Sequence, residues 1–327
     1  MRRAFITGAH GVIGRWLVEA LLDRGIEVAV LRRSPAKPSV LAMEGLEARC
    51  TVVEGDVADA PRLERALAEQ GSDTVFHLAA QSIVGEANRS PLPTFETNVR
   101  GTWNLLEACR LQAVERVVVA ASDKVYGPRT ELPYREDSEF EAHFPYDVSK
   151  ACADLISRSY FRTFGLPVAV ARVANVYGPG DLKASRLVPE LVASVIAGRA
   201  PVIRSDDSPE RDYLYAEDAA AAYLAIAGAI FDGAAGEAFN VGGDEPHAVR
   251  EVVEVLLEVA GADVEPDFRG SGVLPGEIDR QYVDSGKLRA LTGWAPRVEL
   301  REGLRRTLDW YRAHPGALGP LANPSAR

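Results

Sequence analysis

Residues 7–14 read Thr7-Gly8-Ala9-His10-Gly11-Val12-Ile13-Gly14, and this stretch decides the fold. It follows a short strand-like segment and runs directly into an amphipathic helical pattern. The glycines allow a tight turn, a close approach of the backbone to a pyrophosphate, and close packing of the helix on the strand. The N-terminus of that helix favours negative charge. Because the triplet lies between a strand and a helix, it predicts a dinucleotide-binding turn rather than an ordinary glycine-rich loop.

Strand-like and helical patterns alternate through the first half of the chain. The strand-like runs are Ala4–Thr7, Glu27–Leu31, Thr51–Glu54, Thr74–His77, Arg116–Ala120 and Val168–Arg172. The helical patterns between them are Gly14–Arg24, Arg62–Gln70, Phe95–Arg110 and Val148–Phe164. Such alternation implies right-handed crossovers and a parallel sheet with helices on both faces. The sequence therefore predicts an α/β fold, a Rossmann-type doubly wound parallel sheet.

The pattern loosens after about Asn175, where glycine- and proline-rich loops surround helices such as Leu187–Ala197 and Arg250–Ala260. The strand-like run Glu237–Val241 is expected to return to the sheet. We predict a dinucleotide-binding Rossmann domain over residues 1–175, with a return strand near 237–243. Residues 176–236 and 244–327 are expected to form mainly a smaller, discontinuous C-terminal lobe that binds the substrate.

Composition narrows the possible partners. The 327 residues carry a net charge of −10 without any basic block, so nucleic-acid binding has little electrostatic support. The longest uncharged stretch, Ala219–Phe231, is too short to cross a bilayer. Cys50, Cys109 and Cys152 are widely spaced, the N-terminus has no apolar leader, and no metal-ligand spacing occurs. We expect a cytoplasmic protein with reduced thiols, no metal site, and neither nucleic acid nor membrane as partner.

The end of the second strand bears on the choice of cofactor. An acidic residue there usually holds the adenosine ribose hydroxyls, but here Arg32 and Arg33 follow the strand. Two guanidinium groups can bind a ribose 2′-phosphate, which gives NADP a slight preference over NAD. Two solvated surface arginines explain the pair equally well. The cofactor is therefore expected to be NAD(P).

Three residues suggest chemistry at the sheet edge. Tyr146 and Lys150 lie four positions apart in a helical pattern, so both side chains share one face. An adjacent ammonium and an oxidised nicotinamide both favour the phenolate and lower the tyrosine pKa. Ser122 follows the strand Arg116–Ala120, at the carboxyl edge where such sheets bind ligands. The ordinary alternatives are an exposed helix face for the first two residues and a turn cap for Ser122.

The spacing Gly8-x-x-Gly11-x-x-Gly14, together with Ser122, Tyr146 and Lys150, resembles the extended branch of the short-chain dehydrogenase/reductase superfamily. The resemblance implies Tyr146 as acid/base, Ser122 as orienting group and Lys150 as electrostatic tuner that also reaches the nicotinamide ribose. It further implies an adenine contact for Asp56, which is otherwise a simple turn aspartate. The complete set of expected cofactor-binding residues is Gly8, His10, Gly11, Val12, Ile13, Gly14, Arg32, Arg33, Asp56, Val57, Leu78, Ala79, Ala80, Asn98, Tyr146 and Lys150.

The segment Ser122-Asp123-Lys124-Val125-Tyr126-Gly127 resembles the nucleotide-sugar 4,6-dehydratases within the epimerase/dehydratase family. Phe76–Val84 looks like the corresponding segment of CDP-glucose 4,6-dehydratase-like enzymes. The resemblance implies that Asp123 protonates a departing hydroxyl. Lys124 stands where many members place a glutamate base and can replace it only as the neutral amine. The alternative is an ion pair of Asp123 and Lys124 that caps a loop.

Further residues are expected at the substrate by the same resemblance. Asn175 matches an asparagine that touches the diphosphate, and Arg211 matches a phosphate-binding arginine. Many epimerases carry an arginine at the position of Leu274, and Arg280 is the candidate to replace it. The complete set of expected substrate-binding residues is Gln81, Ser82, Asn175, Arg186, Arg211 and Arg280. Surface arginines are the alternative for Arg186.

The favoured interpretation is an NDP-hexose 4,6-dehydratase that oxidises C4 transiently, eliminates water across C5–C6 and returns hydride to C6. The first alternative is an NDP-sugar 4-epimerase, which has no need of Asp123 and Lys124. The second is a non-catalytic dinucleotide-sensing module, against which the intact Ser122, Tyr146 and Lys150 argue. Because related enzymes pair the helices corresponding to Phe95–Arg110 and Val148–Phe164, we expect a homodimer.

Overall fold

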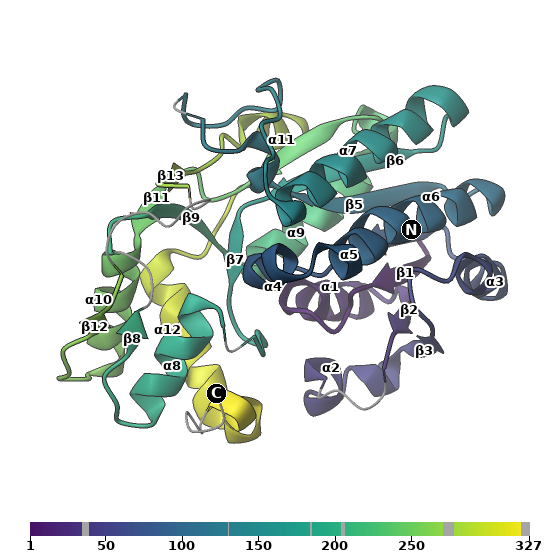
Figure 1. Cartoon of the computed structure of the whole chain (residues 1–327). Coiled ribbons are helices and arrows are strands. Elements are labelled where there is room, and N and C mark those ends of the chain that lie inside the picture. Colours follow the sequence, from purple (N-terminus) through teal and green to yellow (C-terminus); the bar gives the residue numbers. More distant parts are fainter. Residues whose placement is uncertain (35–38, 130, 184, 204–206, 271–277, 322–327) are drawn as a thin grey trace.

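The computed structural model describes residues 1–34, 39–129, 131–183, 185–203, 207–270 and 278–321. Its centre is a seven-stranded sheet in the order β10-β6-β5-β4-β1-β2-β3, parallel throughout (Figure 1). The strands are β1 (Arg3–Thr7), β2 (Glu27–Arg32), β3 (Thr51–Glu54), β4 (Thr74–His77), β5 (Arg116–Ser122), β6 (Val168–Val173) and β10 (Ala238–Val241). The predicted doubly wound Rossmann-type sheet is confirmed, and β10 is the expected return strand.

Helices cover both faces of the sheet because successive strand residues point to opposite sides. Ile6 of β1 packs in one hydrophobic cluster with α1 (Val12–Leu22) and α9 (Ala216–Gly228), whereas Phe5 packs in a second cluster on the opposite face. Helices α3 (Ala60–Gln70) and α6 (Gly101–Leu111) contribute to that second cluster. Burial on both faces explains the nearly continuous apolar strands.

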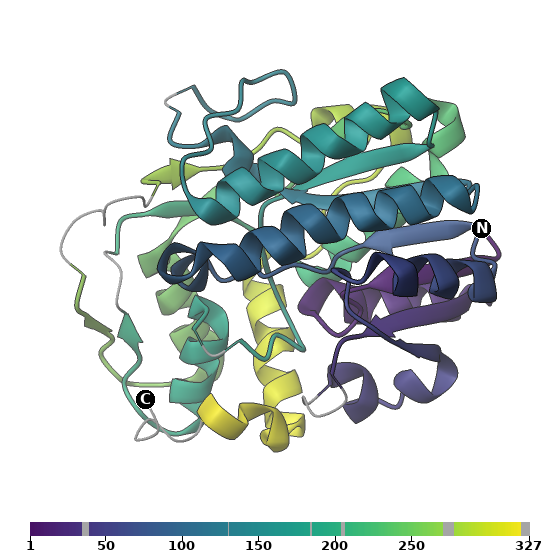
Figure 2. The ribbon, with the colours of Figure 1, turned by 45° about the vertical axis from the view of Figure 1, so that its right-hand side comes forward.

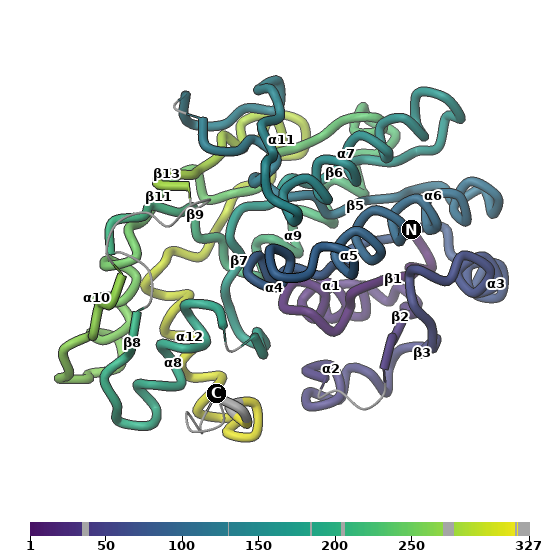
Figure 3. Tube along the Cα trace, in the orientation of Figure 1, coloured from purple at the N-terminus to yellow at the C-terminus, as the bar shows by residue number. Residues whose placement is uncertain are grey.

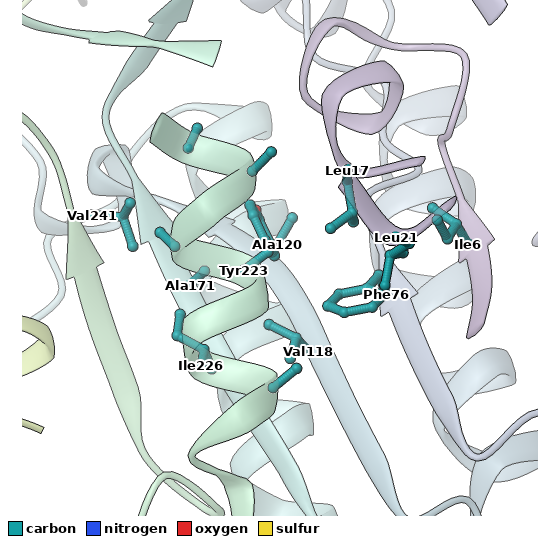
Figure 4. Close-up of a cluster of buried hydrophobic side chains, with 14 of the residues drawn as sticks. Ile6, Leu17, Leu21, Phe76, Val118, Ala120, Ala171, Tyr223, Ile226 and Val241 are labelled. Atoms are coloured by element: carbon teal, nitrogen blue, oxygen red, sulfur yellow. The ribbon is translucent and has the colours of Figure 1, made fainter. Parts of the chain in front are cut away.

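The two layers are visible in the figures. Figure 2 shows α6 and α7 (Pro145–Phe164) running side by side across one face. On the other face, Figure 4 shows side chains of α9 and α1 meeting side chains of the strands. The labelled contacts there include Leu17, Leu21, Ile6, Phe76, Val118, Tyr223 and Ile226.

The predicted helix Phe95–Arg110 is not continuous in the structure. It consists of α5 (Pro91–Phe95), one π-helical turn (Glu96–Arg100) and α6. A π-turn inside a helix often marks a functional position. Here it carries Asn98, which is 2% exposed. The short helices α2 (Val40–Met43) and α4 (Val84–Arg89) lie in the neighbouring connections.

A C-terminal lobe lies beside the sheet and is built from separate stretches of chain, as predicted (Figure 3). Its helices α8 (Leu187–Ile196), α10 (Val249–Ala260) and α12 (Leu300–Ala313) share one hydrophobic cluster. Its strands are β7 (Asn175–Tyr177), β8 (Val202–Ile203), β9 (Glu210–Tyr215), β11 (Pro246–Ala248), β12 (Asp267–Phe268) and β13 (Arg280–Gln281).

Not all of the later chain belongs to this lobe. Helix α9, within the segment 176–236, packs against α1 on the sheet, and α11 (Gly286–Thr292) lies against β10. The division of the chain into two domains therefore stays a prediction. Short 3-10 turns cover Glu47–Arg49, Asp123–Tyr126, Ile230–Asp232 and Pro315–Leu321. Among the described residues, no helix combines the length and apolarity that a membrane crossing needs.

Candidate active site

Ser122 is the last residue of β5 and begins a tight turn at the carboxyl edge of the sheet. Its hydroxyl donates to the carboxylate of Asp123 at 3.0 Å and accepts from the backbone N–H of Lys124 at 3.3 Å. Asp123 is only 2% exposed, and burial raises the pKa of its carboxyl group above the usual value. The second carboxylate oxygen has no hydrogen-bond partner among the described residues. The turn thus presents a buried carboxyl group that favours its protonated form.

Tyr146 reaches the same edge from the first turn of α7. The helix begins at Pro145, before the predicted start at Val148, because proline at the first helical position fixes a helical φ. Burial raises the pKa of Tyr146 to about 12, while the charge of Arg186 and a hydrogen bond with Ser122 lower it. The pKa of Tyr146 thus lies above its ordinary value. The sequence pattern pointed only to effects that lower this pKa. Burial is the larger effect.

Lys150 lies one helical turn further along α7 and is 5% exposed. Its ammonium donates to the backbone carbonyl of Ala120 at 2.8 Å, and burial lowers its pKa to about 8. The cation is therefore held against the backbone of β5, two residues before Ser122. The structure brings Ser122, Tyr146 and Lys150 to one edge of the sheet, and their catalytic roles stay predictions.

Two further residues surround Lys124, and sequence reasoning did not single them out. The ammonium of Lys124 donates to the side-chain oxygen of Gln281 at 3.4 Å, across 157 positions of the chain. Asp147 is buried, and one of its carboxylate oxygens has no hydrogen-bond partner among the described residues. Burial raises the pKa of Asp147 to about 6, with the charge of Lys124 as the strongest opposing influence. Asp147 stood inside the Tyr146–Lys150 segment, whereas no local signal marked Gln281.

Arg186 connects two of the expected substrate residues. Its guanidinium donates to Ser82 at 3.0 Å and to Asp181 at 3.0 Å, and its charge acts on Tyr146. Ser82 lies 104 positions earlier in the chain, so the lobe and the sheet edge meet at this contact. Arg186 is therefore not an isolated surface arginine.

The side chain of Gln81 makes hydrogen bonds to the segments that surround it. Its side-chain amide accepts from the backbone N–H of Ile83 at 2.5 Å and donates to Thr94 at 3.3 Å. Asn98 accepts from the backbone N–H of Gln81 at 2.8 Å and donates to the hydroxyl of Ser149 at 2.9 Å. Asn98 thus ties the segment after β4 to α7, and the sugar contact of Gln81 stays a prediction.

The remaining substrate residues differ in burial. Arg211 is 9% exposed and donates to the backbone carbonyl of Asp279 at 3.1 Å. Its charge opposes, but does not cancel, the rise that burial causes in the pKa of Asp123. The side chain of Arg280 is 53% exposed and pairs with Glu210 at 2.5 Å. Asn175, in β7, is half-buried. Leu274, the position of the expected family arginine, lies outside the described residues.

The glycine-rich turn fits the pyrophosphate of a dinucleotide. Gly8 has a φ of 77°, and a Cβ on it would lie 2.5 Å from the backbone nitrogen of Ala79. A Cβ on Gly14 would overlap with the carbonyl oxygen of Gly8. Gly11 is exposed and caps the N-terminus of α1. The turn therefore packs tightly on its inner side and leads directly into a helix N-terminus, which favours an anion.

The carboxylate of Glu47 lies at the end of β2, where dinucleotide-binding folds hold the adenosine ribose. Glu47 accepts a hydrogen bond from Arg32 at 3.3 Å, and His10 lies 3.0 Å from the same carboxylate. Sequence reasoning missed Glu47 because it stands 15 positions beyond Arg32. Asp56 accepts from the backbone N–H of Ala58 at 2.9 Å, a turn contact that leaves its expected adenine contact a prediction.

A parallel Rossmann sheet with a dinucleotide turn at one strand end and Ser122, Tyr146 and Lys150 at another defines a nicotinamide-dependent enzyme. The family model of the NAD dependent epimerase/dehydratase family matches residues 4–242, so the chain belongs to this family. The predicted family and the prediction of an enzyme are confirmed. Among the described residues, no group of three or more His, Cys, Asp and Glu side chains is placed to hold a metal ion.

Several relatives are similar over nearly the whole chain. A dTDP-glucose 4,6-dehydratase of Streptomyces griseus is 34% identical over 97% of this chain and 96% of its own. DesIV, a dTDP-glucose 4,6-dehydratase of Streptomyces venezuelae solved with NAD and TYD bound, has a TM-score of 0.88 and 33% identity over 98% of this chain and 99% of its own.

Epimerases and longer enzymes are also among the relatives. The UDP-glucose 4-epimerase of Thermus thermophilus, solved with NAD, has a TM-score of 0.85 and 32% identity over 95% of this chain and 99% of its own. The chain spans 40% of the length of a trifunctional Arabidopsis thaliana UDP-glucose 4,6-dehydratase, to which it is 32% identical over 83% of its own length. The family thus includes both reactions predicted from the sequence.

Proposed function

We propose that this protein is an NAD(P)-dependent NDP-hexose 4,6-dehydratase. The observation that carries the proposal is Asp123, a buried carboxyl group with a raised pKa, directly beside Ser122 and Lys124. A protonated carboxyl group at this position can give its proton to a leaving hydroxyl. An epimerase has no such step, and so no use for a buried acid next to the reacting carbons.

The first part of the reaction is the oxidation of C4. A bound nicotinamide supplies a hydride acceptor for C4 and later a hydride donor for C6. Tyr146 takes the O4 proton, and Ser122 holds the reacting oxygen through its hydroxyl. The buried ammonium of Lys150 stabilises the negative charge that develops at the edge of the sheet. These roles agree with the positions of the three side chains around the end of β5.

The second part is the elimination of water. Once C4 is a ketone, the C5–H bond is acidic, and a base can remove its proton while a C5–C6 double bond forms. Asp123 gives its proton to the hydroxyl on C6, the C6–O bond breaks, and water leaves. Lys124, in its neutral amine form, is the proposed base that takes the C5 proton and returns it to C5 when hydride adds to C6. Its side chain donates a hydrogen bond to Gln281, and its charge acts on the buried carboxyl group of Asp147.

The substrate is proposed to be a nucleotide-linked hexose. Arg211, buried and close to Asp123, fits a diphosphate oxygen, and Asn175 lies on β7, which pairs with the strand that carries Arg211. Guanidinium groups bind phosphate oxygens with two parallel hydrogen bonds. Arg186 and Ser82 form a joint contact on the sugar side, and exposed Arg280 fits the outer end of the nucleotide.

The cofactor, the assembly and the compartment are proposed as follows. Arg32 and Arg33, considered alone, favour NADP, although the contact of Arg32 with Glu47 opposes that preference. A homodimer through α6 and α7 covers Trp103 and Leu155, which are 43% and 53% exposed. A cytoplasmic location suits the three free cysteines.

Incubation of the purified protein with CDP-, UDP-, GDP- and dTDP-hexoses tests the proposed reaction. A 4-keto-6-deoxy product, which absorbs in alkali and has lost one water in mass spectrometry, is expected with one of them. A C4 epimer of unchanged mass would instead assign the protein to the epimerases. No conversion of any of the four would remove the proposal.

A further inference from the structure

Glu47 lies between two elements that flank the adenosine half of the dinucleotide site. His10 comes from the glycine-rich turn, and Arg32 is the last residue of β2. The carboxylate of Glu47 is 3.0 Å from the ring nitrogen Nε2 of His10 and 3.3 Å from the guanidinium of Arg32. Its side chain is 16% exposed, so the group is largely enclosed but still reaches solvent. One carboxylate therefore joins the turn that meets the pyrophosphate to the strand end that meets the ribose.

The fold explains how a distant residue arrives there. Glu47 begins the 3-10 turn that leads into β3, and β3 pairs with β2 so that Glu54 lies opposite Arg32. The connection from β2 to β3 therefore runs back over the carboxyl end of β2. At this end, dinucleotide-binding folds usually place an acid that accepts the hydrogen bonds of the ribose hydroxyls. Here the strand itself supplies Arg32, and the connection returns a carboxylate to the same place.

The charges at this point discriminate between two cofactors. The 2′-hydroxyl of NAD is a hydrogen-bond donor, which a carboxylate accepts. The 2′-phosphate of NADP carries up to two negative charges, which a carboxylate at the same place repels. Arg32 can attract the phosphate, but it already contacts Glu47. If Arg32 moved away to contact the phosphate, the largely enclosed carboxylate of Glu47 would lose one partner. This loss costs free energy. Arg33 is exposed, so solvent and salt screen its charge more strongly.

We propose that Glu47 is the residue that determines cofactor specificity, and that it makes the protein prefer NAD over NADP. The acid that is missing at the end of β2 is thus replaced by one from the following connection. The inference rests on the proposed function only in requiring a nicotinamide dinucleotide, and it is independent of whether the sugar is dehydrated or epimerised.

Equilibrium titration of the whole protein with NAD⁺ and NADP⁺, by calorimetry, tests the proposal without any turnover. Wild-type protein is expected to bind NAD⁺ more tightly by about fivefold, the ratio that one water-screened contact between two charges about 4 Å apart provides. In Glu47→Gln, which keeps the size and loses the charge, the ratio of the two dissociation constants is expected to move toward NADP⁺ by about fivefold. Thermal unfolding of each variant verifies that it is folded.

Glu27→Gln is the matched control. Glu27 begins β2, at the opposite end from Arg32, and its side chain is 69% exposed and pairs with Arg3. Removing this charge is expected to leave the ratio unchanged. A wild-type preference for NADP⁺, or a Glu47→Gln ratio equal to that of the wild type, would overturn the inference and leave the proposed function intact. If the wild-type protein bound neither dinucleotide, both the inference and the proposed function would fail.

Discussion

Replacing Asp123 by asparagine changes the chemistry of one buried group and little else. The side-chain oxygen that accepts from Ser122 at 3.0 Å is kept, and the new amide nitrogen takes the place of an oxygen without a hydrogen-bond partner among the described residues. The amide has no proton to give to a leaving hydroxyl. A positioned general acid contributes about 10²- to 10⁴-fold to a rate. We therefore expect elimination to slow by a factor in that range.

Oxidation at C4 is expected to continue in Asp123→Asn, because Ser122, Tyr146 and Lys150 remain. In a single turnover followed by the absorbance of the reduced nicotinamide, reduced cofactor should accumulate instead of being consumed again. The formation of the 4-keto-6-deoxy product, measured in alkali, should fall with the elimination rate. Asp232→Asn, a change of the same kind at an exposed position, is the control and should behave like the wild type. An Asp123→Asn enzyme that forms product at the wild-type rate would refute the role of this acid.

Three other predictions concern single side chains. Tyr146→Phe is expected to abolish turnover and leave the dissociation constant of the cofactor unchanged in calorimetry; turnover at the wild-type rate would remove Tyr146 from the chemistry. The pKa of Asp147 is raised from 3.8 to about 6, so the folded protein binds this proton more tightly than the unfolded chain. The contribution of Asp147 to the stability of the folded protein therefore falls as pH rises from about 4 to 6. In denaturant unfolding, Asp147→Asn should therefore stabilise the protein by up to about 3 kcal/mol at pH 7 and by much less at pH 4. Equal effects at the two pH values would contradict this prediction. Leu155→Glu is expected to yield a monomer in sedimentation, and a dimer of this variant would contradict an interface through α7.

The sequence predicts the parts of the site that depend on sheet topology. In a parallel sheet the carboxyl ends of neighbouring strands share an edge, so the turn after β1 and Ser122 after β5 had to lie on the same side. Tyr146 and Lys150 follow because a helix places positions four apart on one face. These relations need only the order of the elements. They explain why the sequence alone predicts that these residues share an edge of the sheet.

The contacts that the sequence did not predict join segments whose meeting depends on loop geometry. Lys124 meets Gln281 across 157 positions, Arg186 meets Ser82 across 104, and Glu47 reaches Arg32 from the next connection. Periodicity gives the direction of a side chain within an element but not the path of an irregular connection. The start of α7 is a different case, since Pro145 was a readable signal that the apolar pattern from Val148 obscured.

The proton states of the site give a physical reason for the order of the two steps. Burial raises the pKa of both Asp123 and Tyr146, so it shifts each group toward its protonated form. For Asp123 this is the form that elimination needs. For Tyr146 it is the wrong form for oxidation, and with a pKa of about 12 it needs additional positive charge nearby to lose its proton. An oxidised nicotinamide brings such a charge, so Tyr146 acts as a base only beside the hydride acceptor. Burial therefore favours the acid form of Asp123 before the ketone exists, whereas Tyr146 becomes an active base only when oxidation is possible.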